Sequence, residues 1–359
     1  MHPAVHQSPL RHRLDGLLGG ELLFRPVWIG HTSTVGPAAP HRHRPRGAIA
    51  PYTDAVPLPA LLLGWLADEA LGDPRRGHPV AGFGRLAQRL ERRCWRDTRA
   101  AGVAYEILLV GGTIGAAVWL DRVTRATALR LPVRIAATWL VLGGRSLRRE
   151  AAAVDELLAA DELPAARERI RSLVGRDPST LGPDELARAA IESVAENTGD
   201  AVVAPLFWGA VAGLPGLLGY RAINTLDAMV GHRSDRYRRF GWAAARVDDL
   251  ANWLPARCCA GLAVLLAPVV GGSPARALRT IRRDAHQHPS PNAGPIEAAF
   301  AGALGVRLGG RNSYAGQVED RGQLGDGPPP RRTDIARANR LAFAVAAAAA
   351  LLAGATRLK

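Results

Sequence analysis

Long stretches without charge are the feature that most restricts how this chain can fold. Residues 201–220 contain no charged side chain. Four further runs carry at most one charge each, and they cover residues 103–120, 131–144, 254–272 and 341–355. A helix needs about 20 apolar residues to cross the hydrocarbon core of a bilayer. The pattern predicts an all-α fold, a polytopic helical membrane protein, with a shorter sixth candidate at residues 58–71.

The charged residues indicate how such a chain would sit on a membrane. The formal net charge is +14, and almost all of the positive charge is arginine because Lys359 is the only lysine. Basic loops beside apolar segments mark cytoplasmic flanks that contact anionic lipid. We therefore expect the lipid bilayer as a partner, a multi-pass place in the cell membrane, and helical insertions and loops that face the cytoplasm. The alternative is a soluble protein with buried, alanine-rich helices.

Composition excludes several classes of function. P-loop, pyridoxal-phosphate and protein-kinase sites each need a lysine in the body of the chain. Cys94, Cys258 and Cys259 form neither an even set nor a CxxC pair, which argues against disulfides and structural zinc. Aromatic residues do not alternate with the arginines as they do in single-strand binders, so nucleic acid is not an expected partner. Any phosphate must be held by arginine, histidine, backbone amides or a metal.

Two polar regions divide the chain. Residues 1–57 are rich in His, Arg and Pro, and we expect either a disordered extension or an overlong start. This region lacks the pattern of a signal peptide. Residues 58–359 then form the main domain. Between about 145 and 200, apolar residues recur at helical spacing, which predicts a polar, water-exposed helical insertion.

Acidic and amide side chains gather in three groups, each beside an apolar run. In the first group the carboxylates fall four residues apart, so they share one face of a helix, where like charges repel. A cation is therefore expected there. The groups are Glu192, Glu196, Asn197 and Asp200; Asn224 and Asp227; and Asp248, Asp249 and Asn252.

These oxygen ligands favour a particular cation. Carboxylates and amides without a cluster of Cys or His suit Mg²⁺, which bridges protein carboxylates to substrate phosphates. Arg221, Arg246 and Arg257 lie close by in the sequence, and magnesium with arginine is typical of a nucleotide-phosphate site. The alternative is that the acids and arginines only pair with one another on helix surfaces. A charge at membrane depth costs roughly 2.5–3.5 kcal/mol on insertion scales, which favours function.

Three loops supply further polar side chains. HPSPNAG (288–294) and GGRNSYAG (309–316) are punctuated by Pro and Gly, and LGDPRRGHPV (71–80) follows an apolar run. Their side chains could orient a polar ligand, although ordinary turn chemistry explains the Pro, Asn and Gly equally well. The candidates are His78, His288, Ser290, Asn292 and Tyr314.

Several long motifs, in a fixed order, resemble one known family. They are LLGWLADEALGDPRRGHPVAGFGR, VGRDPSTL, ESVAENTGDAVVAPLFW, YRAINTLDAMVGHRSDRYRRFGWAAARVDDLANWLPAR, HPSPNAGPIEAAFAGALGVRLGG and NSYAG. Together they resemble the CobD/CbiB family of cobalamin biosynthesis proteins. The resemblance covers about residues 58–359 and leaves the N-terminal extension unexplained.

The resemblance implies an activity. Members of that family are integral membrane adenosylcobinamide-phosphate synthases, which join (R)-1-aminopropan-2-ol or its O-phosphate to adenosylcobyric acid through an amide bond. ATP would be the cosubstrate and Mg²⁺ the metal. The partners would be the corrinoid, the aminopropanol (phosphate), the bilayer and other enzymes that assemble the nucleotide loop, with the active site facing the cytoplasm.

Roles follow from chemical type and motif position. Glu196, Asp200, Asp227 and Asp249 would hold the metal, with the amides of Asn197, Asn224 and Asn252 in support. Arg221, Arg246 and Arg257 would hold phosphates. Glu192 or Asp248 would take the proton of the ammonium group. His78, His288, Ser290, Asn292 and Tyr314 would contact substrate.

The positions of the acidic motifs restrict how the chain can cross the membrane. They lie on both sides of residues 201–220, so one simple crossing would leave half of a cytoplasmic site outside the cell. Pro205, Gly213, Pro215 and Gly216 interrupt this segment. We expect it to dip into the membrane and return, or to be shielded by protein, as irregular backbone at membrane depth requires.

Two rival functions stay open. A magnesium-dependent membrane prenyl- or alcohol-phosphate transferase also uses Asp-rich helices, but its DxxxD and DxxDGxxAR motifs are absent. The second rival is a non-enzymatic scaffold that binds or transports corrinoids.

Overall fold

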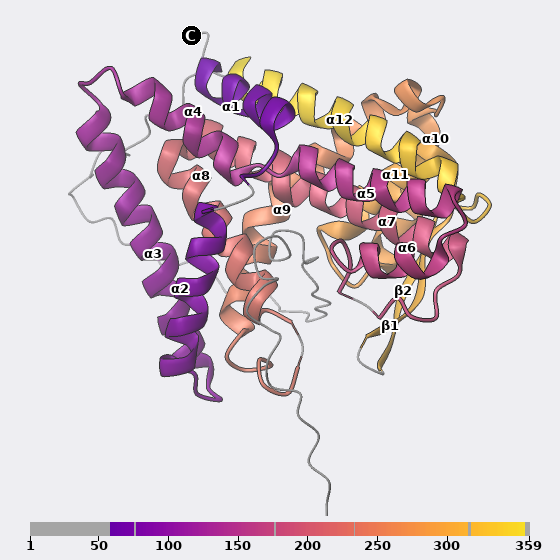
Figure 1. Ribbon diagram of the computed structural model, residues 1–359, viewed down its shortest axis with the longest axis horizontal. Helices are drawn as coiled ribbons and strands as arrows, with labels where there is room; N and C mark the ends of the chain where they lie inside the picture. Colours follow the sequence, from indigo (N-terminus) through magenta and orange to yellow (C-terminus); the bar gives the residue numbers. More distant parts are fainter. Residues whose placement is uncertain (1–57, 75–76, 176, 233, 315–316, 356–359) are drawn as a thin grey trace, which may run out of the picture.

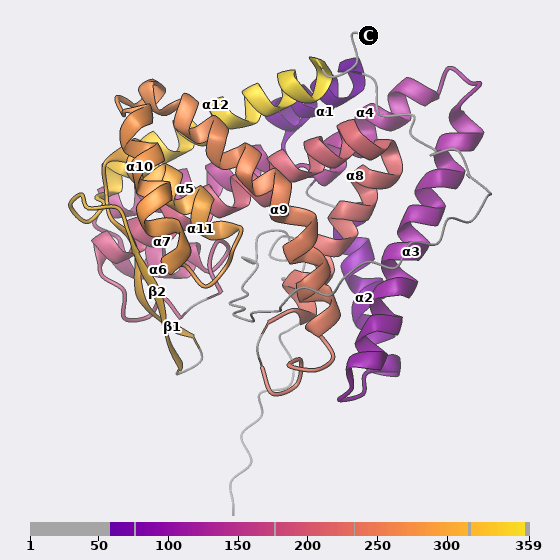
Figure 2. The same cartoon turned by 180° about the vertical axis from the view of Figure 1, so that it is seen from behind.

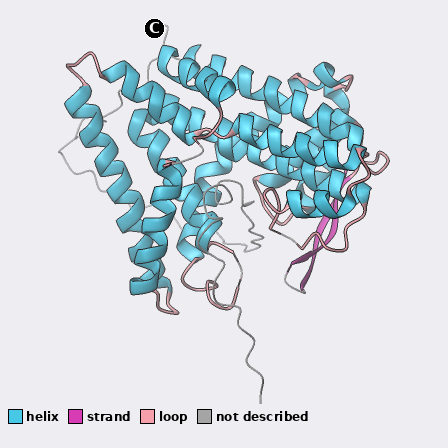
Figure 3. Ribbon diagram, in the orientation of Figure 1, coloured by secondary structure: helices cyan, strands magenta, loops and turns pink. Residues whose placement is uncertain are grey.

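The computed structural model describes residues 58–355, except 75–76, 176, 233 and 315–316, and this part is almost entirely helical (Figure 3). The extension expected at residues 1–57 lies outside the described residues. The helices are α1 (Leu58–Leu71), α2 (Pro79–Cys94), α3 (Arg99–Thr124), α4 (Arg130–Val141), α5 (Gly144–Ala159), α6 (Leu163–Ile170), α7 (Pro183–Thr198), α8 (Ala204–Val230), α9 (Trp242–Leu265), α10 (Pro274–Asp284), α11 (Ala293–Leu304) and α12 (Arg332–Ala355). Short 3₁₀ turns follow α9 and α10.

One β-hairpin corrects the expectation of an all-α chain. The Gly-rich segment, expected to be a turn, forms antiparallel strands β1 (Leu308–Tyr314) and β2 (Gln317–Leu324). Gly309, Gly310 and Gly322 adopt φ values of 80°, 89° and 67°, a region that other residues rarely enter. The ladder shifts register between Gly309 and Arg311. Glycine therefore lets this segment bulge and pair, which a pattern of hydrophobic residues does not reveal.

The helices are arranged in three parts (Figures 1 and 2). α2 and α3 stand at one side, α8 and α9 lie in the middle, and α5, α6, α7, α10 and α11 with the hairpin form the other side. α12 runs along one edge and packs against α5, α7 and α1. The middle helices thus join the two sides, and α7 leads directly into α8.

The largest hydrophobic cluster lies around α7, α11 and α12. Its fully buried members include Ile191, Phe300 and Val345, together with many alanines that let the helices pack closely. The segment expected to be a water-exposed insertion contributes to this cluster, because one face of α5 and almost all of α7 are buried. The polar residues of α7 are therefore held in the interior.

Helix α8 doubles back in its first half. Gly213 has φ 69° and ψ −154°, which are not helical, and Pro215 follows it. The two limbs touch, since a Cβ added at Gly216 would lie 2.5 Å from the Trp208 carbonyl oxygen. The hydroxyl of Tyr220, in the second limb, lies 3.1 Å from the Asp200 carbonyl oxygen. The ends of residues 201–220 therefore meet, as expected for a segment that turns back.

Among the described residues, three helical stretches are long and apolar enough to cross a membrane: Arg99–Thr124, Pro183–Val230 and Arg332–Gly354. The runs expected at 131–144 and 254–272 instead form the 12-residue α4 and the second half of α9 with a 3₁₀ turn. α3 leaves Ile107, Leu108 and Trp119 exposed on the protein surface. A membrane association fits these features, while the number of crossings stays a prediction.

Candidate active site

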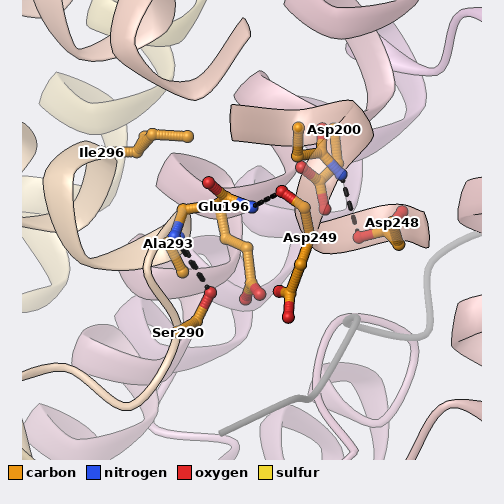
Figure 4. A pocket seen from close by; sticks show the side chains of 9 residues that line it. Glu196, Asp200, Asp248, Asp249, Ser290, Ala293 and Ile296 are labelled. Carbon is orange, nitrogen blue, oxygen red and sulfur yellow. Dashed lines mark hydrogen bonds between the residues drawn. The ribbon is translucent and has the colours of Figure 1, made fainter. Parts of the chain in front are cut away.

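A small pocket of about 20 Å³ brings two of the three predicted acidic groups together with the 288–294 loop (Figure 4). A cavity of this size holds about one water molecule or one ion. Its lining residues are Glu196, Asp200, Asp248, Asp249, Asn252, Ser290, Asn292, Ala293 and Ile296. Side chains that are about 50 to 100 positions apart in the sequence thus meet in one place.

The end of α7 sets the position of the first group. A π-helical turn, Gly199–Val203, follows α7 and carries Asp200; such turns are frequent at functional sites. A Cβ at Gly199 would lie 2.5 Å from the Ile296 Cδ1 atom of α11. Glycine is therefore needed for this turn to approach α11, which closes one wall of the pocket.

Helix α9 supplies the third group, which is tied to α8 by hydrogen bonds. The Asn252 Nδ2 atom donates to Asp248 Oδ2 at 2.9 Å, and its Oδ1 accepts from the Tyr220 hydroxyl at 2.8 Å. Asn252 thus fixes the direction of Asp248. Tyr220, which the sequence did not single out, links α8, α9 and the π-helical turn.

The loop before α11 closes the remaining wall. Asn292 Nδ2 donates to the Asp249 carbonyl oxygen at 2.8 Å, and Ser290 Oγ accepts from the Ala293 amide at 3.1 Å. His288 Nδ1 accepts from the Ser290 amide at 3.0 Å. Burial, reinforced by Arg321, lowers the pKa of His288 to about 3. The ring is therefore neutral, and because Nδ1 accepts, its proton is on Nε2.

Two buried charges beside this loop were missed by sequence reasoning. His288 Nε2 lies 3.5 Å from Glu297 Oε1, and Arg321 Nη1 lies 3.7 Å from the same atom. Arg321 comes from strand β2 and also interacts electrostatically with Glu196. The hairpin thus brings a guanidinium next to the pocket. The available signal was Glu297 itself, the one charged residue in the apolar sequence of α11.

The three predicted arginines lie in different surroundings. Arg221 is only 8% exposed, lies near Asp200 and Asp73, and has an Nε atom without a hydrogen-bond partner. Arg246 is partly exposed, with Nη1 3.9 Å from Asp249 Oδ2. Arg257 donates to Asn292 Oδ1 at 2.8 Å and to the Pro291 carbonyl oxygen at 3.1 Å. Arg257 therefore anchors the loop, whereas Arg221 is buried beside two carboxylates, and its role as a phosphate ligand stays a prediction.

Other candidates lie outside the pocket lining. Glu192 Oε1 accepts from the Gly309 amide at 2.9 Å, so it holds the base of the hairpin. Asn197 donates to the Ser193 carbonyl oxygen within α7. His78 caps α2 by accepting from the Val80 amide at 3.2 Å. Tyr314 ends β1, and its side chain is outside the described part of the chain.

The second acidic group borders the pocket from the α8 side. Asn224 and Asp227 are buried, and Asn224 lies beside Asp200 and Asp248. Asp227 lies within electrostatic reach of Asp248, Asp249 and Asp200. All three groups are therefore close together, although only two of them line the pocket.

Negative charge is crowded together at this site. Burial raises the pKa of Asp248 well above its usual range, and the charge of Asp200 raises it further. Among the described residues, Asp248 Oδ1 and both oxygens of Asp227 are buried without a hydrogen-bond partner. Buried polar atoms are nearly always paired in native proteins. A bound cation would satisfy these oxygens.

The donor set suits Mg²⁺, with one condition. The oxygens are hard ligands, and Cys and His do not take part in the lining. Within the described residues, no group of three or more His, Cys, Asp or Glu side chains is spaced to hold a metal by itself. Mg²⁺ commonly binds through one or two carboxylates together with water and substrate phosphates. Phosphate oxygens would thus have to complete its coordination.

Comparison with known proteins decides the family. A family model described as "CobD/Cbib protein" matches residues 61–342. The chain belongs to the CobD/CbiB family. It is 55% identical over 295 residues to "Cobalamin biosynthesis protein CobD" of Mycobacterium tuberculosis (strain ATCC 25618 / H37Rv), covering 82% of this chain and 93% of that protein. No solved structure matches the chain.

Two more distant relatives carry the same name. CobD of Rhodobacter capsulatus is 46% identical over 291 residues, covering 75% of this chain and 88% of the relative. CobD of Chromobacterium violaceum is 45% identical over 307 residues, covering 81% and 96%. The family expected from the sequence motifs is therefore confirmed. All residues that line the pocket lie within the part that matches the CobD/CbiB family.

Proposed function

We propose that this CobD/CbiB protein acts in cobalamin biosynthesis as an ATP-dependent amide ligase. It would join (R)-1-aminopropan-2-ol, or its O-phosphate, to adenosylcobyric acid and give adenosylcobinamide or its phosphate. The observation that carries the proposal is the meeting of buried carboxylates from α7, α8 and α9 beside the buried guanidinium of Arg221. The names of the relatives support the pathway.

The first step activates the substrate carboxylate. Its oxygen attacks the γ-phosphorus of ATP, the bond to the β,γ-bridging oxygen breaks, and ADP leaves with that electron pair. Negative charge crowds together in this step, so fixed positive groups are needed. Arg221 is the buried arginine near Asp200 that can bind such an anion. Mg²⁺ held by Glu196, Asp200 and Asp249 would neutralise phosphate oxygens.

The second step forms the amide. The amine nitrogen attacks the acyl carbon, the carbon–oxygen bond to phosphate breaks, and inorganic phosphate leaves. The protonated amine must give up one proton before it attacks and a second as the amide forms, so a carboxylate that can accept a proton has to lie nearby, and water can take the other. Of the two acceptors considered, Asp248 lines the pocket while Glu192 is bonded to the hairpin. Asp248 is therefore the better acceptor.

The fold supports an active site at the cytoplasmic face of the cell membrane. Because α8 turns back at Gly213, the second limb returns Asp227 to the side that carries Asp200. Both acidic groups can then face the cytoplasm, where ATP is present, while the apolar helices lie in the cell membrane. Single-cysteine variants at residues 200 and 227, labelled with an impermeant reagent in intact cells and in inverted vesicles, test this. Labelling from opposite sides would contradict it.

One observation favours a second candidate function. An apolar cavity of about 370 Å³ lies between α2, α3, α4 and α8 and includes Phe83, Leu120 and Leu140. It also reaches Arg221. A lipid-linked phosphate would find an apolar cavity beside an arginine there, as in a membrane alcohol-phosphate transferase.

One assay separates these functions. The purified chain is incubated with adenosylcobyric acid, ATP and Mg²⁺, with each amine in turn, and the product and ADP are quantified by mass spectrometry. The proposal expects one ADP for each amide formed. Asp249→Ala should remove the activity, and Asp177→Ala, at an exposed acid, is the matched control. Absence of turnover with both amines, or full activity of Asp249→Ala, would reject the proposed ligase.

A further inference from the structure

Glu106 is a buried acid that neither the sequence motifs nor the pocket accounts for. It lies within the apolar helix α3 and is 5% exposed, and both of its carboxylate oxygens are buried without a hydrogen-bond partner among the described residues. Such a group is costly to bury and is rarely left unpaired in a native protein. Charges within a membrane-length apolar helix are usually functional. Glu106 therefore requires an explanation.

A second acid in the same condition lies close to it. Asp227 of α8 is 2% exposed, and both of its oxygens are also buried without a hydrogen-bond partner in the part of the chain that the structure describes. Glu106 contributes to the electrostatic environment of Asp227, together with Asp248, Asp249 and Asp200. α3 packs directly against both α8 and α9, as Figure 1 also shows for α3 and α8. Two packed helices thus each bury an acid without a hydrogen-bond partner among the described residues, and the two acids lie within electrostatic reach of one another.

The chemistry of these atoms defines what they can bind. The four oxygens of Glu106 and Asp227 are acceptors, and within the described residues no arginine forms a salt bridge with either. Arg221, the buried arginine nearby, is instead near Asp200 and Asp73. Asp248 Oδ1, another acceptor without a partner, adjoins Asp227 on the pocket side. The fitting occupant is a small cation that donates several hydrogen bonds.

We propose that Glu106 and Asp227 form a binding subsite for the primary ammonium group of the amine substrate. This inference rests on the proposed ligase function and adds the place of the second substrate. A primary alkylamine is protonated near neutral pH and presents three N–H donors, as the side chain of lysine does. Asp248 lines the pocket and lies within electrostatic reach of Asp227, so the nitrogen would be held on the side of the pocket where the activated carboxyl group is expected.

With this subsite, the two ends of the active site bind groups of opposite charge. Arg221 takes an anion at the end near Asp200 and Asp73, and Glu106 with Asp227 takes a cation at the end toward α3. Opposite charges on the two substrates would thus orient them relative to each other. Glu106 touches substrate in this scheme, and its loss should act on the amine alone.

The test compares, within the same variant, the effects on the amine and on ATP. The full chain is purified in nanodiscs as wild type, Glu106→Gln and Glu106→Asp, and binding of 1-aminopropan-2-ol is measured by calorimetry at pH 7 without turnover. Loss of a hydrogen-bonded charge predicts at least about tenfold weaker amine binding for Glu106→Gln. Kinetics should show the KM for the amine raised by a similar factor and the KM for ATP changed by less than about twofold. Glu106→Asp should recover part of the affinity.

A matched control covers the packing of α3. Tyr105 is buried beside Glu106 and donates to the Ala87 carbonyl oxygen at 3.0 Å, so Tyr105→Phe disturbs the same turn without altering the acid. It should bind the amine as wild type does. Unchanged amine binding in Glu106→Gln would overturn the subsite. So would an equal rise of both KM values, or a raised Mg²⁺ requirement with normal amine binding, which would indicate a metal ligand instead.

The two proposals fail separately. If the wild type binds the amine but consumes no adenosylcobyric acid with ATP, the ligase function is wrong, and the calorimetric comparison of Glu106→Gln still decides the subsite. If the wild type is an active ligase and Glu106→Gln binds the amine normally, only the subsite is wrong. Thermal unfolding of each variant confirms that a loss of binding does not come from misfolding.

Discussion

Helix α3 carries two buried acids in opposite situations. Asp121 is paired with Arg134 of α4, with Arg134 Nη2 2.6 Å from Asp121 Oδ1 and both side chains 1% exposed. Glu106, four turns earlier on the same helix, has no hydrogen-bond partner for either oxygen among the described residues. Both acids interrupt an apolar sequence. Of two acids on the same helix, one thus forms an ion pair through one of its oxygens, and the other forms none within the described part of the chain.

This difference distinguishes a charged residue that stabilises the fold from one that is available to bind a ligand. An ion pair that the protein itself completes joins two helices and needs no ligand. A buried acid without a partner lowers the stability of the ligand-free protein, and binding of a cation removes this cost. Such a loss of stability is common at functional sites. On this reasoning Asp121 belongs to the scaffold, and we propose that Glu106, Asp227 and Asp248 belong to the site. The predictions below test this division.

The largest effect is expected from breaking the ion pair. Arg134→Met leaves Asp121 buried and unpaired, which should lower the free energy of unfolding by about 3–5 kcal/mol. Replacing both residues, as Asp121→Leu with Arg134→Met, should restore most of it because no charge stays unpaired. Unfolding in detergent measures both variants. Equal stability of the single and the double variant would show that the pair is not what holds α3 to α4.

Substituting an acid that lines the pocket should lower the activity and leave the stability unchanged. Asp200→Asn keeps the shape of the side chain and removes a charge from the acidic cluster. Loss of such an electrostatic group should lower kcat about 10²–10³-fold. Thermal stability should not fall, since one like charge is removed from its neighbours. A variant that loses stability and activity together would place Asp200 in the scaffold with Asp121.

Replacing Glu106 should change the free energy of unfolding in the opposite direction from replacing Arg134. Glu106→Met has a similar volume and removes the unpaired carboxylate, so the free energy of unfolding should rise by about 1–3 kcal/mol. Chemical unfolding of the ligand-free chain measures this change. A decrease would mean that Glu106 is satisfied by the fold, and the contrast with Asp121 would then disappear.

His288 gives the smallest effect and depends on pH. Its folded pKa, about 3, lies below the unfolded value of about 6.5 because the ring is buried. The unfolded chain therefore binds a proton between these values while the folded chain does not, and stability is lost as pH falls through this window. The expected slope is about 1.4 kcal/mol per pH unit below pH 6.5. His288→Asn should reduce the slope measured between pH 6.5 and pH 5, and an unchanged slope would contradict the prediction.

The sequence predicted the long helices and the family well, for a physical reason. Apolar runs of membrane length are local, and they correspond to α3, part of α8 and α12. The acidic groups stood out because charge beside such runs is unusual. The hairpin was missed because its pairing depends on glycines with positive φ, and such backbone angles leave no pattern of hydrophobicity.

Contacts between distant segments could not be predicted. Arg257 looked like a phosphate ligand by its chemical type, yet its donors are used by the loop at residues 291–292. Arg321 reaches Glu297 and Glu196 only because the hairpin folds against α11. Glu106 is a different case, since it is the one acid in the apolar run at residues 103–120 and is therefore visible in the sequence alone.

The fold-back of α8 at Gly213 bears on how the chain enters a membrane. A helix that continued straight would carry Arg221 and Asp227 through the lipid to the far surface, at roughly 2.5–3.5 kcal/mol for each charge at mid-depth. Because α8 turns back at Gly213, its second limb returns toward Asp200, and the charged residues avoid that passage. If this segment enters a membrane, we expect its two limbs to insert together with the apolar turn first, while the polar ends remain at the surface.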